Sequence, residues 1–185
     1  MAWIVLGVVV LLLLWLVVVY NRLVALRQTT GQAWSDVDVQ LKLRHDLVPN
    51  LVETVKGYAA HERGTLEAVV QARNAALGAN GPAAQAKAEG QLGAALGRLL
   101  ALKEAYPELK ANQNFLQLQG ELGDLENKIA AARRFFNNAV AEYNAAIQSV
   151  PAVFFAGSLG FTGRGFFELP EAERAAVNTV PQVKF

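Results

Sequence analysis

The first residues of the chain, 1–20, contain no charged side chain and no proline. As a helix rising about 1.5 Å per residue, this segment is about 30 Å long, which matches the hydrocarbon core of a bilayer. Trp3 and Tyr20 lie near its two ends, where amphipathic rings settle at headgroup depth. A core helix of a soluble domain is the alternative, but such helices rarely run this far without a polar face. The segment therefore predicts a transmembrane anchor.

A cleaved signal peptide fits the segment less well than an anchor does. Signal peptides begin with a basic stretch and end at small residues, whereas no basic side chain precedes this apolar run. Arg22 and Arg27 follow it directly, and Arg22 joins Trp3 and Tyr20 as an interface anchor. Because Lys and Arg are retained in the cytoplasm, we expect a single-pass protein of the cell (inner) membrane. Its N-terminus would lie outside and its domain would be cytoplasmic.

The composition argues against several classes of protein. The chain has no cysteine, so disulfide frameworks, thiol catalysis and thiolate metal sites are excluded. With 17 basic and 16 acidic residues, it has no broad positive field for nucleic acid. His45 and His61 fit neither the HExxH nor the Glu-x-x-His pattern of metal sites. We therefore expect no cofactor, no metal, no catalytic residue and no nucleic-acid partner.

Apolar residues recur every three or four positions along residues 21–150, which is the period of amphipathic helices. Proline and glycine signals near Pro49, at residues 78–82 and at residues 106–107 mark turns between the helices. At Pro49 the alternative is one kinked, continuous helix. The predicted helices cover about 21–47, 49–77, 82–103 and 108–150. The expected fold class is all-α: a transmembrane helix over 1–20, then an up-and-down antiparallel four-helix bundle over 21–150.

Residues 151–185 form an irregular segment that is rich in phenylalanine and glycine. Disordered segments are poor in aromatic residues, so we expect this one to dock on the bundle, on a neighbouring copy or on the membrane interface. Packing between copies is favoured, because anchoring in one membrane raises the effective concentration of like faces. The candidate assembly surface consists of Phe154, Phe155, Phe161, Phe166 and Phe167.

A polar pattern runs beside the apolar stripes. One explanation is a solvated helix shoulder. The other is a buried hydrogen-bond network that fixes the register of the helices, because buried polar groups need partners. A ligand site is the least favoured interpretation. The residues concerned are Arg44, Asp46 and Asn50 near the first turn, and Glu126, Arg133, Asn137 and Asn144 on the last helix.

Several stretches carry a resemblance to a known family. The most specific reads DLVPNLVETV, at residues 46–55; others lie at 20–24, 33–41, 44–45, 58, 61–62, 126–130, 132–133, 136–137, 142–144 and 183–185. By these stretches the chain resembles the LemA family. It departs at Val150, where phenylalanine is usual before the proline, and at Phe136, where tyrosine is common. The resemblance implies one N-terminal span, a cytoplasmic antiparallel helical bundle and no established enzymatic activity.

The anchor, the long helix that follows it and the aromatic segment favour a non-enzymatic membrane scaffold or assembly protein. We expect it to self-associate and to contact membrane lipid, with other membrane or cytoplasmic proteins as further partners. One alternative is a module that binds lipid or a small apolar ligand, with the small residues of the helix at 82–103 forming a pocket wall. A metal-binding or catalytic bundle is the other alternative.

Overall fold

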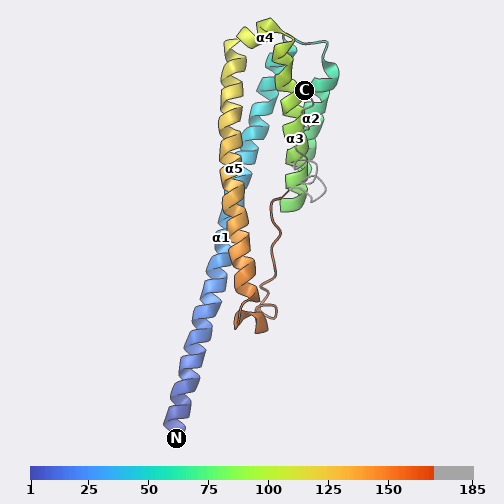
Figure 1. Cartoon of the computed structure of the whole chain (residues 1–185). Helices are drawn as coiled ribbons and strands as arrows, with labels where there is room; N and C mark the ends of the chain where they lie inside the picture. Colours follow the sequence, from blue (N-terminus) through green and yellow to red (C-terminus); the bar gives the residue numbers. More distant parts are fainter. Residues whose placement is uncertain (169–185) are drawn as a thin grey trace, which may run out of the picture. The chain divides into compact units, whose positions relative to one another are not determined.

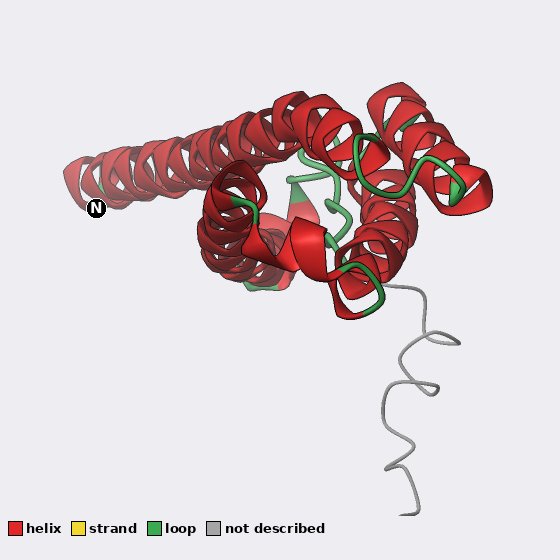
Figure 2. Ribbon diagram, turned by 90° about the horizontal axis from the view of Figure 1, so that it is seen from above, coloured by secondary structure: helices red, strands yellow, loops and turns green. Residues whose placement is uncertain are grey.

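The computed structural model of the chain describes residues 1–168, and predictions for residues 169–185, including Phe185, lie outside it (Figure 1). The described residues form helices and loops, without a strand (Figure 2). The all-α class is therefore confirmed. The elements are α1 (Ala2–Lys56), α2 (Arg63–Gly78), α3 (Pro82–Ala101), η1 (Leu102–Glu104), α4 (Pro107–Ala111), α5 (Gln113–Gln148) and η2 (Ala152–Phe154).

Helix α1 runs through Pro49, so the predicted boundary near that residue was wrong. Proline lacks the N–H group that would bind the carbonyl of His45, one turn earlier. In the structure Arg73 of α2 takes over this role, because its Nε donates to the His45 carbonyl at 2.7 Å. The helix thus continues past Pro49 although a local hydrogen bond is missing. It ends at Lys56, and α2 begins at Arg63.

Helices α2 and α3 lie side by side (Figures 1 and 2). Gly81 has a φ of 83°, a left-handed conformation that favours glycine, and Pro82 opens α3. The predicted stop and restart between residues 78 and 82 is confirmed.

The last predicted helix, over 108–150, is divided in two at Asn112. The side-chain oxygen of Asn112 accepts a hydrogen bond from the N–H of Phe115 at 2.9 Å, which caps the start of α5. Its amide nitrogen donates to the hydroxyl of Tyr58 at 2.7 Å. Asn112 therefore ends the short helix α4 and begins α5.

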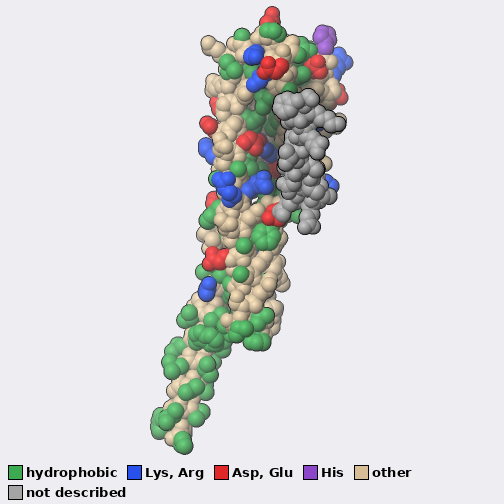
Figure 3. Space-filling view, viewed as in Figure 1, with side chains coloured by type: hydrophobic (Ala, Val, Ile, Leu, Met, Phe, Trp, Pro, Cys, Tyr) green, Lys and Arg blue, Asp and Glu red, His purple; other side chains and the backbone are tan. Residues whose placement is uncertain are grey.

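Within residues 1–168, α1 is the one helix that is long and apolar enough to cross a membrane. The side chains of residues 1–18, its N-terminal part, are exposed. In Figure 3 hydrophobic side chains, without charged ones, cover this end of the helix on the face shown. The long apolar N-terminal helix is confirmed, and its insertion in a membrane stays a prediction.

The contacts divide the chain into two units, each with its own buried core. Unit 1 comprises Met1–Val37 and Ala132–Gly165; of the described residues, unit 2 comprises Asp38–Ala131 and 166–168. A buried cluster in unit 1 contains Leu23, Tyr143, Ile147, Ala152, Ala156 and Phe161. The largest side chains buried in unit 2 include Leu51, Leu92, Leu99, Leu109 and Phe115.

In unit 1 the chain beyond α5 returns along helices of the same unit. The hydroxyl of Tyr143 donates to the carbonyl of Thr162 at 3.0 Å. The guanidinium of Arg164 donates to the hydroxyl of Thr30 at 2.5 Å, and Thr30 itself is fully buried. The segment 151–165 is thereby held against α1 and α5.

Candidate functional site

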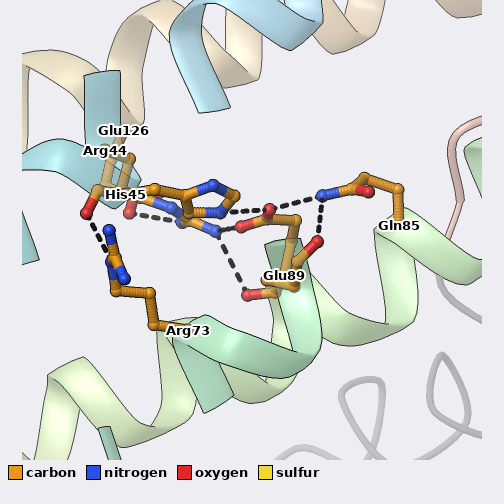
Figure 4. Close-up of polar contacts among 7 residues, drawn as sticks. Arg44, His45, Arg73, Gln85, Glu89 and Glu126 are labelled. Atoms are coloured by element: carbon orange, nitrogen blue, oxygen red, sulfur yellow. Dashed lines mark hydrogen bonds and ion pairs between the residues drawn. The ribbon is translucent and has the colours of Figure 1, made fainter. Parts of the chain in front are cut away.

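Unit 2 contains a cluster of charged and polar side chains, which we call the ion cluster: the buried Arg44, His45, Gln85 and Glu89, and the more exposed Glu126 (Figure 4). Arg44 and His45 are neighbours on α1, Gln85 and Glu89 lie one turn apart on α3, and Glu126 comes from α5. Arg44, His45 and Glu89 are only 3%, 4% and 6% exposed. Charges buried to this degree persist when they are paired and hydrogen-bonded.

Glu89 is the centre of the ion cluster. Its carboxylate forms an ion pair with the guanidinium of Arg44 and lies 2.7 Å from Nε2 of His45. The amide of Gln85 donates to the same carboxylate at 2.7 Å. The backbone carbonyl of Glu89 also accepts from Arg44, at 3.3 Å. The side chain and the backbone carbonyl of Glu89 thus both bind residues of α1, which holds α3 in register with α1.

Arg44 also reaches a second carboxylate. Its Nη1 donates to Glu126 of α5 at 2.6 Å. The side chain of Glu126 is 45% exposed, so water shares this pair, whereas the pair with Glu89 is buried. Arg44 therefore joins three helices of unit 2 by charge-assisted hydrogen bonds, which are stronger than neutral ones.

The ion cluster keeps Glu89 ionised. Burial alone would raise the pKa of this carboxyl group. The hydrogen bond from His45 and the charge and hydrogen bonds of Arg44 act in the opposite direction and outweigh burial. The pKa of Glu89 therefore lies below the ordinary value of a glutamate, and the ion pair is intact at neutral pH.

Gln85 and Arg73 bind backbone carbonyls next to the ion cluster. Gln85 donates to the carbonyl of Ala76, near the C-terminal end of α2, at 3.1 Å. That carbonyl also accepts from the N–H of Ala79, so Gln85 is its second donor. Arg73 binds the carbonyl of His45, which Pro49 leaves without its helical partner in α1. Both side chains thus add to the backbone hydrogen bonding around the ion cluster.

The structure brings two of the predicted network residues together in unit 2. Arg44 and Glu126 are bonded, while Asp46 and Asn50 point to the surface and line a groove of about 400 Å³ with Asp124. In unit 1 the side chain of Asn144 binds both the N–H and the carbonyl of Arg164, each at 2.9 Å. Arg133 and Asn137 are half-buried in unit 1.

The predicted interface and assembly residues differ in exposure. Trp3 is 84% exposed, Arg22 is exposed, and Tyr20 packs edge to face on Phe161. Phe161 and Phe167 are buried within the chain, and Phe155 is half-buried. Phe154 and Phe166, at 80% and 37%, are the exposed members of the candidate assembly surface. In residues 1–168, no group of three or more acidic or histidine side chains is arranged to hold a metal ion.

Comparison with known proteins decides the family. The model of the LemA family matches residues 33–185, which is most of the chain. The chain belongs to the LemA family. The resemblance found in the sequence is thereby confirmed, and the ion cluster of this LemA-family protein lies inside the matched range.

The relatives are similar over most of this LemA-family chain. The magnetosome protein MamQ of Magnetospirillum gryphiswaldense is 27% identical, over 89% of this chain and 70% of its own. Magnetosome protein MamQ 2 of Paramagnetospirillum magneticum is 26% identical, over 80% and 64%. Protein LemA of Metamycoplasma hominis is 25% identical, over 86% and 73%. The matched region thus spans about two thirds to three quarters of the length of these relatives.

Sequence reasoning missed His45, Gln85 and Glu89 as members of the site in this LemA-family protein. A signal was present, because each lies at helical spacing from residues of an apolar stripe. On α3, Gln85 and Glu89 precede Leu92 and Leu96 on one face, and that face is buried. Charged and amide side chains on the apolar face of a helix therefore indicated a buried polar cluster.

Proposed function

We propose that this protein is a single-pass, non-catalytic membrane scaffold that presents helical units at the cytoplasmic face of the cell (inner) membrane. It would act by binding further copies of itself or other proteins. The observation that carries the proposal is the continuity of α1, in which the apolar residues 1–20 pass without interruption into the core of unit 1. Leu23 already belongs to the buried cluster that contains Tyr143 and Phe161. The continuity of the apolar segment with a buried helix supports its proposed role as an anchor.

The chemistry of the ion cluster supports a structural role. Glu89 already receives bonds from three side chains, Arg44, His45 and Gln85. A general base or a metal ligand needs a lone pair that can reach the substrate or the metal. Here the lone pairs are used to hold helices together. The names of the relatives state no reaction either.

The lipid-binding alternative has support at a place other than the expected one. An apolar groove of about 420 Å³ is lined by α1 residues such as Leu13 and Tyr20, with Phe155 and Leu159 opposite. Its walls do not come from α3. The groove lies on the apolar part of α1, where the scaffold would meet the bilayer.

Two measurements on the full-length protein test the scaffold. Light scattering in mild detergent should give a mass of several copies, and a monomer would contradict self-association. External protease on intact spheroplasts should remove a tag placed before Met1 and spare the helical units. Degradation of the units from outside would contradict the cytoplasmic orientation.

A further inference from the structure

Two segments that are distant in the sequence meet on the apolar part of α1. We call residues 150–161, which contain η2, the turn segment. Its residues Phe155 and Leu159 line the groove of about 420 Å³ with Leu13, Leu16, Val17 and Tyr20 of α1. The ring of Phe161 packs on that of Tyr20, with 5.6 Å between centroids and 75° between planes. The turn segment is therefore packed on the part of α1 that is assigned to the membrane.

The contacts give the depth of the turn segment. Arg22 is the first charged side chain of the chain, and Leu13 lies about 13 Å farther along the helix toward the N-terminus. This is close to half of a hydrocarbon core of about 30 Å. A segment that lines one groove with Leu13 therefore extends beyond the level at which α1 would leave the water.

The position of the last charged side chain on α5 indicates the same depth. Glu142 lines a cavity of about 210 Å³ together with Arg22 and Ser149. After Glu142 no Asp, Glu, Lys or Arg occurs before Arg164. The chain thus passes beyond the level of Arg22, turns, and returns without carrying a charged side chain with it.

The surface of the turn segment is apolar. Phe154 and Val150 are 80% and 76% exposed, and Leu159 and Val153 are 50% and 48% exposed. Apolar side chains that gather on one exposed segment mark a surface that meets a partner or a membrane.

Backbone N–H groups of the turn segment form hydrogen bonds with nearby backbone carbonyls. The N–H of Val153 donates to the carbonyl of Ser149 at 3.0 Å, and the N–H of Leu159 donates to the carbonyl of Phe155 at 3.1 Å. The N–H of Phe161 donates to the carbonyl of Ala156 at 2.9 Å. A segment that enters lipid needs this internal pairing, because hydrocarbon offers no hydrogen-bond partner.

We propose that the turn segment enters the membrane leaflet next to the end of the anchor, with Phe154 and Leu159 among the acyl chains and a lipid chain in the groove. This rests on the proposed anchoring of residues 1–20. Bilayer lipid is favoured over a second copy of the protein, because one wall of the groove consists of residues of the span itself. Those residues would face lipid even if the protein were a monomer.

Site-directed spin labelling tests the proposal, and the absence of cysteine makes single-cysteine variants clean. The full-length variant Phe154→Cys would carry a nitroxide in vesicles of phosphatidylethanolamine and phosphatidylglycerol. Oxygen concentrates in lipid, whereas a neutral nickel chelate stays in water. Leu11→Cys is the control for the span and Asn138→Cys, at an exposed position of α5, is the control for water. Phe154→Cys and Leu159→Cys should resemble Leu11→Cys, with relaxation by oxygen exceeding that by nickel.

Three other results would overturn the proposal. If nickel relaxes both turn-segment labels as it does the Asn138 label, while the Leu11 label meets lipid, the anchor stands and the inference fails. If neither relaxant reaches the two turn-segment labels, and the spectra of these labels broaden through spin–spin coupling, a second copy covers the surface. If nickel also reaches the Leu11 label, the anchoring itself fails. Because Phe154 is 80% exposed, its replacement leaves the packing of unit 1 intact.

Discussion

Removal of the Glu89 carboxylate should destabilise unit 2 strongly. In Glu89→Ala the guanidinium of Arg44, whose side chain is 4% exposed, loses its buried partner. His45 and Gln85 lose the acceptor that they share. Breaking a buried ion pair by removing one partner costs about 3–5 kcal/mol, because an uncompensated charge stays buried.

The second carboxylate places the expected loss at the lower end of this range. Arg44 still donates to Glu126 at 2.6 Å, and the exposure of Glu126 admits water to that pair. We therefore expect a loss of about 3 kcal/mol in the free energy of unfolding. At about 2–4 °C per kcal/mol for a domain of this size, the melting temperature should fall by roughly 6–12 °C.

The assay is thermal unfolding of the full-length protein in detergent, followed by the circular dichroism of its helices. Glu53→Ala is the matched control, because the side chain of Glu53 is 71% exposed and pairs with Lys56 at 3.2 Å. Such a surface pair contributes about 0–1 kcal/mol. Equal, small shifts for Glu89→Ala and Glu53→Ala would refute the reasoning. The double variant Arg44→Met/Glu89→Met should recover stability, because it leaves neither charge of the pair buried.

Two further predictions concern protons and the chain beyond α5. The lowered pKa of Glu89 means that its contribution to stability is complete above the pKa of an unfolded glutamate and is lost as the pH falls through the lower, folded value. Melting temperatures measured on acidification below about pH 4 should therefore fall less in Glu89→Gln than in the parent. Asn144→Ala should cost roughly 1–3 kcal/mol, because both backbone groups of Arg164 lose their partner. Asn138→Ala, at an exposed position, should leave the melting temperature unchanged, and hydrogen exchange should rise at Arg164 only in Asn144→Ala.

Local patterns predicted most of the helices, because their causes are local. The long apolar helix at the N-terminus follows from an uninterrupted apolar run, and the turn at Gly81 follows from a backbone conformation that favours glycine. Pro49 is different. A proline inside a helix costs about 3 kcal/mol by itself, and the compensating donor, Arg73, lies on another helix. A rule that considers only neighbours along the chain cannot include that donor, so it places a helix end where none exists.

The ion cluster shows which part of a site can be predicted from one sequence. A charge on the apolar face of a helix can be buried only where a second helix brings an opposite charge to the same level. Arg44 and His45 lie on the buried face of α1, beside Leu41 and Val48. Their partner must therefore be a carboxylate on another buried face. Glu89 meets this condition and is the acidic residue that is buried within residues 1–168. Periodicity alone could have proposed this pair. The bond from Arg44 to Glu126 could not have been singled out in this way, because the side chain of Glu126 is 45% exposed and its helical position resembles that of any solvated glutamate.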